Sequence, residues 1–344
     1  MPLSHIHFYS RKRFDVWRDL EKLGPDDIAA GQARFRSGVD VWVVQTYLYV
    51  AAALRERGLV VTAGPQVPRD AIIVAHRDDL NRFFGGLHRS FIVGVRADRS
   101  PVTVADIEIL QNDLEVSAAY QRYIPLWPQP GLLRRDAARA ARVQRLAYFG
   151  RVDSLPPWMR SDAFLGELAK LEIEFDIRGV AWNDYRDIDV VLAHRIEAPS
   201  MLAQKPATKL YNAWLAGVPA LLAPEPAYQK LRQSPFDYLE VQGPEDVIAA
   251  LTRIKNEPGL YAAMRAQCDA RAPEFSIERI AQMWLTVLGE AVEHYPAWRA
   301  GRASFAAWPD YVRRLMQQKR EAADFRQRID RELAAIDAPA PVRQ

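Results

Sequence analysis

The feature that most constrains this fold is a series of short apolar segments, each a few residues long, separated by segments of helical or polar character. In the first part of the chain these segments are His5–Ser10, Leu59–Thr62, Ala71–Ala75, Phe91–Val95 and Ile107–Leu110. Such short, β-branched segments are typical of strands buried on both faces of a sheet. Because they alternate with helices expected at Val41–Arg57 and Asp78–Phe84, they predict right-handed βαβ units and a parallel sheet.

The same pattern repeats after a proline-rich stretch that contains Pro125, Pro128, Pro130 and Trp127. Prolines this closely spaced favour a stiff linker, so we expect a second α/β unit beyond them. We predict three parts: an N-terminal domain over 1–130, a second domain over 131–290 and a helical tail over 291–344. The strands and helices expected in the second domain are Leu146–Phe149, Ser161–Leu171, Ile173–Ile177, Asp189–Ala193, Thr208–Ala216, Val218–Ala223, Pro244–Asn256 and Pro258–Arg271. Ser161 is the expected N-cap of its helix.

Composition excludes several classes of protein. With 344 residues, 49% hydrophobic, the chain can bury a sizeable core. Its formal net charge is only +3, which argues against a nucleic-acid-binding protein. The single cysteine, Cys268, permits no internal disulfide, and the N-terminus has no apolar run of signal-peptide length. We therefore expect a cytoplasmic protein.

Polar residues that follow the predicted strands are the first candidates for a site, since ligands of open parallel sheets bind beyond the carboxyl ends of the strands. In the first domain these candidates are His76, Asp78, Arg96 and Asp98. In the second domain they are Arg151, Arg195 and Glu225.

The most informative segment is Lys205–Pro219, which reads as a loop, a helix, a glycine stop and the start of a strand. Thr208 is the expected N-cap of this helix, and Lys205 and Lys209 flank its N-terminus. Free backbone N–H groups and the positive end of the helix dipole favour anions there. We therefore predict a phosphate or diphosphate site at this helix N-terminus.

This segment follows the pattern K-P-x-x-K-L-x-x-A-x-x-x-G-V-P-x-L-x-x-P, which resembles the donor-binding half of GT-B glycosyltransferases. The resemblance covers about residues 145–288 and, for the first half, only the topology. Asn212 and Gln204 stand where the family-four type carries the two glutamates of its E-x7-E signature. The T-K-L element with Lys209 is similar to the E-K-L element of GT-B fucosyltransferases, whose lysine contacts the donor diphosphate.

The resemblance implies two Rossmann-like domains that face each other and a sugar transfer from a nucleotide diphosphate sugar, of hexosyl or deoxyhexosyl type. It implies no metal and no cofactor other than this donor. It also implies a carbohydrate, lipid-linked or protein acceptor, in bacterial surface polysaccharide or glycolipid synthesis. The donor-side candidates are Arg151, Arg195, Lys205, Thr208, Lys209, Asn212 and Glu225. His76 and Asp98 are candidate bases, and Arg96 and Asp78 lie on the acceptor side.

Two other functions stay open, a GT-B sugar epimerase and a non-catalytic GT-B-like subunit. In the tail, apolar residues recur every seven positions, which predicts a long amphipathic helix packed on the body. A dimeric coiled coil and a helix at the inner face of the membrane are the alternatives, so a homodimer and a peripheral membrane contact stay open. The heptad positions are Trp308, Leu315, Ala322, Ile329 and Ile336.

Some motifs have a plain structural interpretation beside a functional one. Asp187-x-Asp189 is similar to a metal-binding motif, but it precedes a strand and reads as a strand-start turn. His5-x-His7 lacks a visible third ligand for a metal. Trp127 either belongs to the linker or stacks on a sugar, and the loop Trp182–Tyr185 either closes a turn or touches the donor base.

Overall fold

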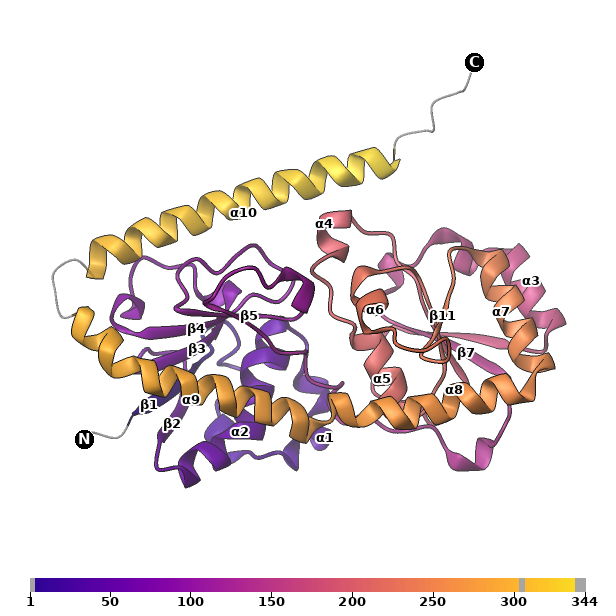
Figure 1. The fold of residues 1–344 in the computed structure, drawn as a ribbon, viewed down its shortest axis with the longest axis horizontal. Coiled ribbons are helices and arrows are strands. Elements are labelled where there is room, and N and C mark those ends of the chain that lie inside the picture. Colours follow the sequence, from indigo (N-terminus) through magenta and orange to yellow (C-terminus); the bar gives the residue numbers. More distant parts are fainter. Residues whose placement is uncertain (1–3, 303–306, 338–344) are drawn as a thin grey trace, which may run out of the picture. The chain divides into compact units, whose positions relative to one another are not determined.

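The computed structural model describes residues 4–302 and 307–337 and divides into two compact units (Figure 1). The first unit comprises the described parts of Met1–Trp127, Ala198–Pro206 and Ile280–Gln344. The second comprises Pro128–Glu197 and Ala207–Arg279. Unlike the expected domains, neither unit is a single continuous stretch of chain.

A six-stranded parallel sheet with the order β2-β1-β3-β4-β5-β6 forms the centre of the first unit. Side chains alternate between its two faces. Phe8 contacts Tyr47 of helix α2 (Gln45–Glu56) on one face, while Tyr9 packs with Tyr311 and Leu315 of helix α10 (Ala307–Asp337) on the other. The strands are β1 (His5–Tyr9), β2 (Val60–Gly64), β3 (Ile72–His76), β4 (Phe91–Val95), β5 (Ile107–Leu110) and β6 (Gln121–Tyr123).

The helix expected over Val41–Arg57 begins with a π-helical turn, Asp40–Val44, and continues as α2. The buried Asp40 carboxylate holds this start, because it accepts hydrogen bonds from Trp17 Nε1, Arg13 Nε and the Ser37 hydroxyl. A short helix α1 (Asp27–Ala30) precedes it.

The prediction of a helix over Asp78–Phe84 is wrong, because only a 3-10 turn, Arg77–Asp79, forms there. Its first turn is capped by His76 Nδ1, which accepts from the Asp78 amide. Beyond it, Gly85 and Gly86 have φ angles of 111° and 88°, and left-handed backbone of this kind does not continue a helix.

The second unit contains a five-stranded parallel sheet with the order β11-β10-β9-β7-β8. Helix α5 packs on one face with Ala147 and Phe149, whereas α3 and α7 pack on the other with Leu146 and Tyr148. The strands are β7 (Arg145–Phe149), β8 (Glu174–Arg178), β9 (Val190–Ala193), β10 (Ala220–Leu222) and β11 (Leu239–Glu240). The helices are α3 (Asp162–Lys170), α5 (Thr208–Ala216), α6 (Pro226–Leu231), α7 (Pro244–Asn256) and α8 (Pro258–Arg271).

Several local signals in this unit are confirmed. Ser161 caps α3, its Oγ accepting from the Phe164 amide at 3.2 Å. Gly217 ends α5 in the left-handed conformation, with a φ of 70°. Asp189 is fully buried and binds Arg135 and Arg139, as a structural strand-start residue should.

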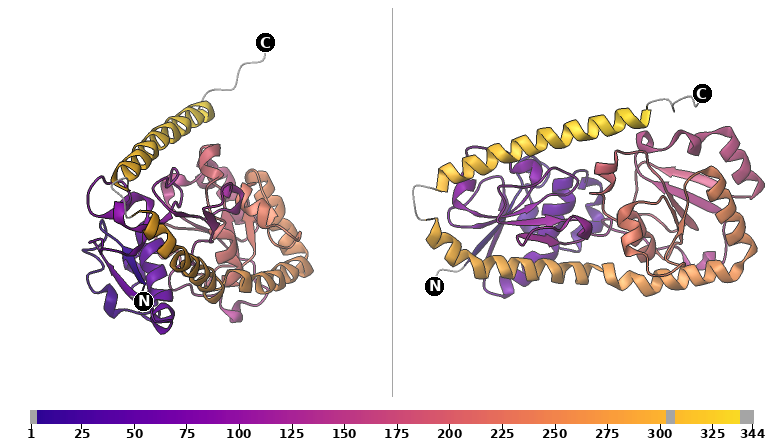
Figure 2. Two further views of the ribbon diagram at one scale, coloured as in Figure 1. Left: turned by 60° about the vertical axis from the view of Figure 1, so that its left-hand side comes forward. Right: turned by 45° about the horizontal axis from the view of Figure 1, so that its top comes forward.

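The described part of the tail is helical almost throughout, as predicted, and Tyr311 and Leu315 near the start of α10 pack on the first unit. Helix α9 (Ile277–Gly301) and helix α10 (Ala307–Asp337) are both visible as long rods in Figure 2. Gln318 of α10 is buried and donates to the Leu80 carbonyl at 2.8 Å. The apolar stripe is less buried towards the end of α10, where Leu333 and Ile336 are 38% and 44% exposed.

A short helix α4 (Pro199–Leu202) lies in the segment 198–206, which joins β9 to α5. This segment is held by the first unit, because Gln111 Nε2 donates to the Gln204 carbonyl at 2.8 Å and Ser200 binds Glu332 of α10.

Candidate functional site

The strand order of the second unit places a topological switch point between β7 and β9. The chain leaves β7 towards β8 on one side, and it leaves β9 towards β10 on the other. The connections diverge there, so the carboxyl ends of β7 and β9 flank the crevice in which such sheets bind ligands. Arg151 follows β7, Arg195 follows β9 and Glu225 follows the neighbouring β10, as the sequence predicted.

Arg195 and Glu225 form a buried ion pair at this edge. Arg195 Nε lies 2.9 Å from Glu225 Oε1, and Arg195 Nη2 donates to the Tyr228 hydroxyl at 3.0 Å. Glu225 is only 2% exposed, and its Oε2 has no hydrogen-bond partner in the described part of the chain. Burial alone would lower the pKa of Arg195, but Tyr228 and Glu225 raise it above its ordinary value.

Tyr148, at the end of β7, joins this pair to the N-terminus of α5. Lys209 Nζ lies 4.1 Å from the centroid of the Tyr148 ring, a cation–π contact. Burial raises the pKa of Tyr148, whereas Arg195 opposes the rise. We call Tyr148, Arg195, Lys209, Glu225 and Tyr228 the switch-point cluster.

The residue directly after β7 is a glycine, Gly150, for a steric reason. A Cβ atom at Gly150 would lie 2.8 Å from the Tyr148 hydroxyl, so only glycine permits the ring to lie there. Arg151, with a side chain 74% exposed, contacts only Asp153 among the ion pairs of the described residues, at 3.3 Å. It is therefore available to a ligand at the surface.

Thr208 does not cap α5, contrary to the prediction. The N-cap position is Ala207, and within the described chain no side chain makes a capping hydrogen bond there. Thr208 is the first helical residue, and its Oγ1 lies 3.0 Å from the Tyr211 hydroxyl. The helix thus begins one residue earlier than a threonine cap would require.

Asn212, expected at the donor ribose, is 4% exposed and bonds within the protein. Its Oδ1 accepts from the Gln129 amide at 3.2 Å. Asn212 therefore anchors the start of the second unit in this structure.

Lys205 lies in the segment held by the first unit, where its Nζ is 3.1 Å from Asp98 Oδ2. Burial alone would raise the pKa of Asp98, but Lys205 and Arg99 hold it below its ordinary value. Asp98 is therefore ionised at neutral pH.

The other candidate residues of the first unit are either buried or held in ion pairs. His76 is 1% exposed, and burial lowers its pKa to about 4. Its Nε2 faces the backbone of Gly38, where an added Cβ would lie 2.7 Å away. Asp78 pairs with Arg99 at 3.1 Å, and Arg96 pairs with Glu115 at 3.3 Å. In this conformation His76 is shielded from solvent.

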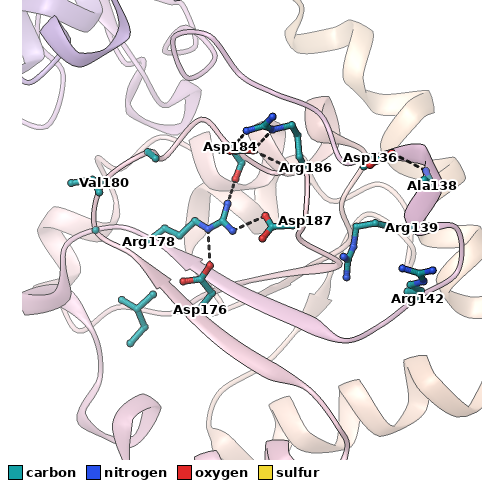
Figure 3. A pocket seen from close by; sticks show the side chains of 13 residues that line it. Asp136, Ala138, Arg139, Arg142, Asp176, Arg178, Val180, Asp184, Arg186 and Asp187 are labelled. Atoms are coloured by element: carbon teal, nitrogen blue, oxygen red, sulfur yellow. Dashed lines mark hydrogen bonds and ion pairs between the residues drawn. The ribbon is translucent and has the colours of Figure 1, made fainter.

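A separate open pocket of about 800 Å³ lies beside β8. Figure 3 shows Arg178 between Asp176, Asp184 and Asp187, with Arg139 and Arg142 across the pocket. Arg178 donates to Asp176 at 2.8 Å and to Asp187 at 2.6 Å, so these charges are largely neutralised within the protein.

Two aromatic side chains that the sequence singled out, Trp127 and Tyr185, are packed inside the protein. Trp127 is 1% exposed and donates from Nε1 to Thr46 Oγ1 at 2.8 Å, so it is a core residue and does not stack on a sugar. Tyr185 stacks on Phe149 with ring centroids 4.2 Å apart and is also buried, whereas Trp182 of the same loop is 36% exposed, so a contact of this loop with the donor base stays a prediction.

Sequence reasoning missed Tyr148 and Tyr228, which complete the switch-point cluster. The available signals were the position of Tyr148 two residues before Gly150 and that of Tyr228 three residues after Glu225. Within residues 4–302 and 307–337, no group of three or more His, Cys, Asp or Glu side chains is arranged to hold a metal ion.

No known family model matches this sequence, and no curated protein matches it either. Solved structures do match. HepE of Anabaena in complex with UDP and glucose has a TM-score of 0.51 and 13% identity, covering 83% of this chain and 100% of its own. AviGT4, a glycosyltransferase involved in avilamycin A biosynthesis, has a TM-score of 0.50 and 14% identity, covering 87% and 99%. The chain has the GT-B fold of such glycosyltransferases, which confirms the predicted fold class.

Proposed function

We propose that this protein transfers a sugar from a nucleotide diphosphate sugar, with the donor bound at the switch-point cluster of the second unit. The observation that carries the proposal is the cluster itself, which gathers Arg195, Glu225 and Lys209 at the carboxyl ends of the strands. The fold supports it, since HepE, whose structure holds UDP and glucose, shares that fold.

The chemistry of such a transfer needs positive charge where the leaving group departs. An acceptor hydroxyl attacks the anomeric carbon, the bond from that carbon to the diphosphate oxygen breaks, and the nucleoside diphosphate keeps the electron pair. Lys209, the exposed Arg151 and the backbone N–H groups at the start of α5 supply fixed positive charge for it. Arg195, paired with Glu225, orders the loops around that charge.

The acceptor proton needs a base, and His76 and Asp98 are our proposed candidates. Asp98 fits the role better in this conformation, because its side chain is 32% exposed, whereas that of His76 is 1% exposed. We further propose a carbohydrate, lipid-linked or protein acceptor, a hexosyl or deoxyhexosyl donor, no metal requirement and a role in bacterial surface polysaccharide synthesis.

A thermal-shift panel of UDP, GDP, dTDP, CDP and CMP tests the proposal on the wild type, Lys209→Ala and Lys170→Ala. Lys170 is the matched control, because it lies in the same unit, on α3, with a side chain 72% exposed. A ligand at about 100 times its Kd stabilises by about 2.7 kcal/mol. We expect one nucleotide to shift the wild type and Lys170→Ala equally and Lys209→Ala less. A flat panel, or an equal shift in all three proteins, would contradict the proposal.

A non-catalytic GT-B-like subunit is the second candidate. It is favoured by Asn212, whose oxygen is bonded to the Gln129 amide, and by Gln204, because both stand where the resembled family carries glutamates. Release of nucleoside diphosphate from a nucleotide sugar by the purified chain would exclude it.

A further inference from the structure

An aromatic patch lies on the first unit where the loop after β3 meets the start of α10. The patch consists of Phe83, Phe84 and Trp308. Phe84 is 75% exposed, and its ring stacks on Trp308 with centroids 5.8 Å apart. Phe83 and Trp308 are partly buried against the core below. Apolar side chains exposed singly are common on protein surfaces, but contiguous ones mark interaction sites, and here Phe84 lies against a second aromatic ring, Trp308.

The patch continues along one row of α10. Val312 and Met316 follow Trp308 at intervals of four residues, which places all three on one side of the helix. Met316 is 42% exposed. The left-handed backbone of Gly85 and Gly86 turns the chain directly after Phe84, so this phenylalanine sits at the bend of the loop.

The surroundings of the patch are strongly basic. Residues 82–89 and 308–320 contain six arginine and lysine residues and one acidic residue, Asp310. Lys319 Nζ lies 4.2 Å from the centroid of the Phe83 ring, so one of these cations adjoins the aromatic surface. Arg314 is engaged by Asp106 and Arg313 by Asp310. This charge is far denser than the net +3 of the whole chain would suggest.

We infer that the aromatic patch binds peripherally to the surface of a bilayer that contains anionic lipids. Aromatic rings partition into the interface between headgroups and acyl chains, and lysine and arginine around them pair with anionic headgroups. Basic charge beside exposed aromatic rings fits this partner better than a second copy of the same patch, which would bring like charges together. In the described residues no helix is long and apolar enough to cross a membrane, so the contact is a surface one.

Co-sedimentation of the full chain with two kinds of vesicle tests this inference: phosphatidylcholine alone, and phosphatidylcholine with about one third phosphatidylglycerol. We expect the wild type to sediment with the anionic vesicles only, and less at high salt. Phe84→Ser and Lys319→Ala should each weaken binding about fivefold. Val180→Ser, at a site 82% exposed in the second unit, and Arg18→Ala, with a side chain 72% exposed, are the matched controls and should bind as wild type.

Three results would overturn the inference: no sedimentation with anionic vesicles, equal sedimentation with both kinds, or unchanged binding by Phe84→Ser. Size-exclusion chromatography without lipid provides the other check. A concentration-dependent dimer that Phe84→Ser abolishes would assign the patch to a second copy and would also overturn it. Because Phe84 and Lys319 are at the surface, each variant should keep the wild-type Tm, which verifies its fold.

Discussion

Replacing Asp189 with asparagine should destabilise the second unit strongly. Both carboxylate oxygens of this fully buried residue accept from N–H donors. Oδ1 accepts from Arg135 and Arg139, whereas Oδ2 accepts from Arg139 and from the backbone amides of Gln144 and Arg145. Whichever way an asparagine amide turned, its NH₂ group would face donors. The Arg135 guanidinium, with a side chain 1% exposed, would also lose its countercharge.

Breaking a buried pair by removing one partner costs about 3–5 kcal/mol. With an m-value of about 2 kcal/mol/M, this lowers the urea midpoint of the second unit by about 2 M. The matched control is Asp187→Asn, because Asp187 contacts Arg145 and Arg178 but its side chain is 40% exposed. That variant should lose at most about 1 kcal/mol.

The pH dependence gives an independent check. Burial alone would raise the pKa of Asp189, but the hydrogen bonds from Arg139, Arg135 and the backbone hold it below its ordinary value. A carboxylate of lowered pKa stabilises the fold above its unfolded pKa, about 3.9, and that stabilisation is lost as the pH falls through the folded pKa. The difference in the free energy of unfolding between wild type and Asp189→Asn should therefore be largest at pH 7 and should shrink in acid below about pH 4. Urea unfolding followed by circular dichroism measures it, and equal midpoint shifts for the Asp189 and Asp187 variants would refute the reasoning.

Three further predictions concern other contacts. Because burial lowers the pKa of His76 to about 4, the wild type should lose stability as the pH falls from about 6.5 to 4, and His76→Gln should lose about 3 kcal/mol less over that window by thermal unfolding. Ser161→Ala removes the cap of α3 and should lower the free energy of unfolding in urea by about 1 kcal/mol, whereas Ser161→Asp should retain most of that stability. Thr46→Val leaves the buried Trp127 N–H without its acceptor and should cost about 1–3 kcal/mol, whereas Thr46→Ser should lower the Tm less.

The architecture was largely accessible from the sequence because short apolar strands and capped helices are local signals. Ser161, Gly217 and the strand ends at Arg195 and Glu225 were all identified in this way. The sequence predictions failed where contacts between residues far apart in the chain determine the local structure. Thr208 has the composition of a cap, yet the helix starts at Thr208 itself and its hydroxyl meets Tyr211 instead.

The same limit applies to the candidate site. Lys205 is close in sequence to Lys209, but the contacts of Ser200 and Gln204 hold its segment to the first unit. Lys205 pairs with Asp98 and Asn212 with Gln129, and both partners are far away in the sequence. No local sequence pattern predicts such pairs. Tyr148 could be recognised as part of the cluster only once its ring was seen beside Lys209.

The central claim is that a nucleoside diphosphate binds at the carboxyl ends of β7, β9 and β10. Hydrogen–deuterium exchange of the full chain, with and without the nucleotide selected by the thermal panel, tests it most directly, because it locates the ligand along the sequence. The account predicts slower exchange over residues 148–152, 194–197, 207–212 and 224–228. Slower exchange confined to residues 176–187 beside the arginine-lined pocket, or no change anywhere in the second unit, would contradict it.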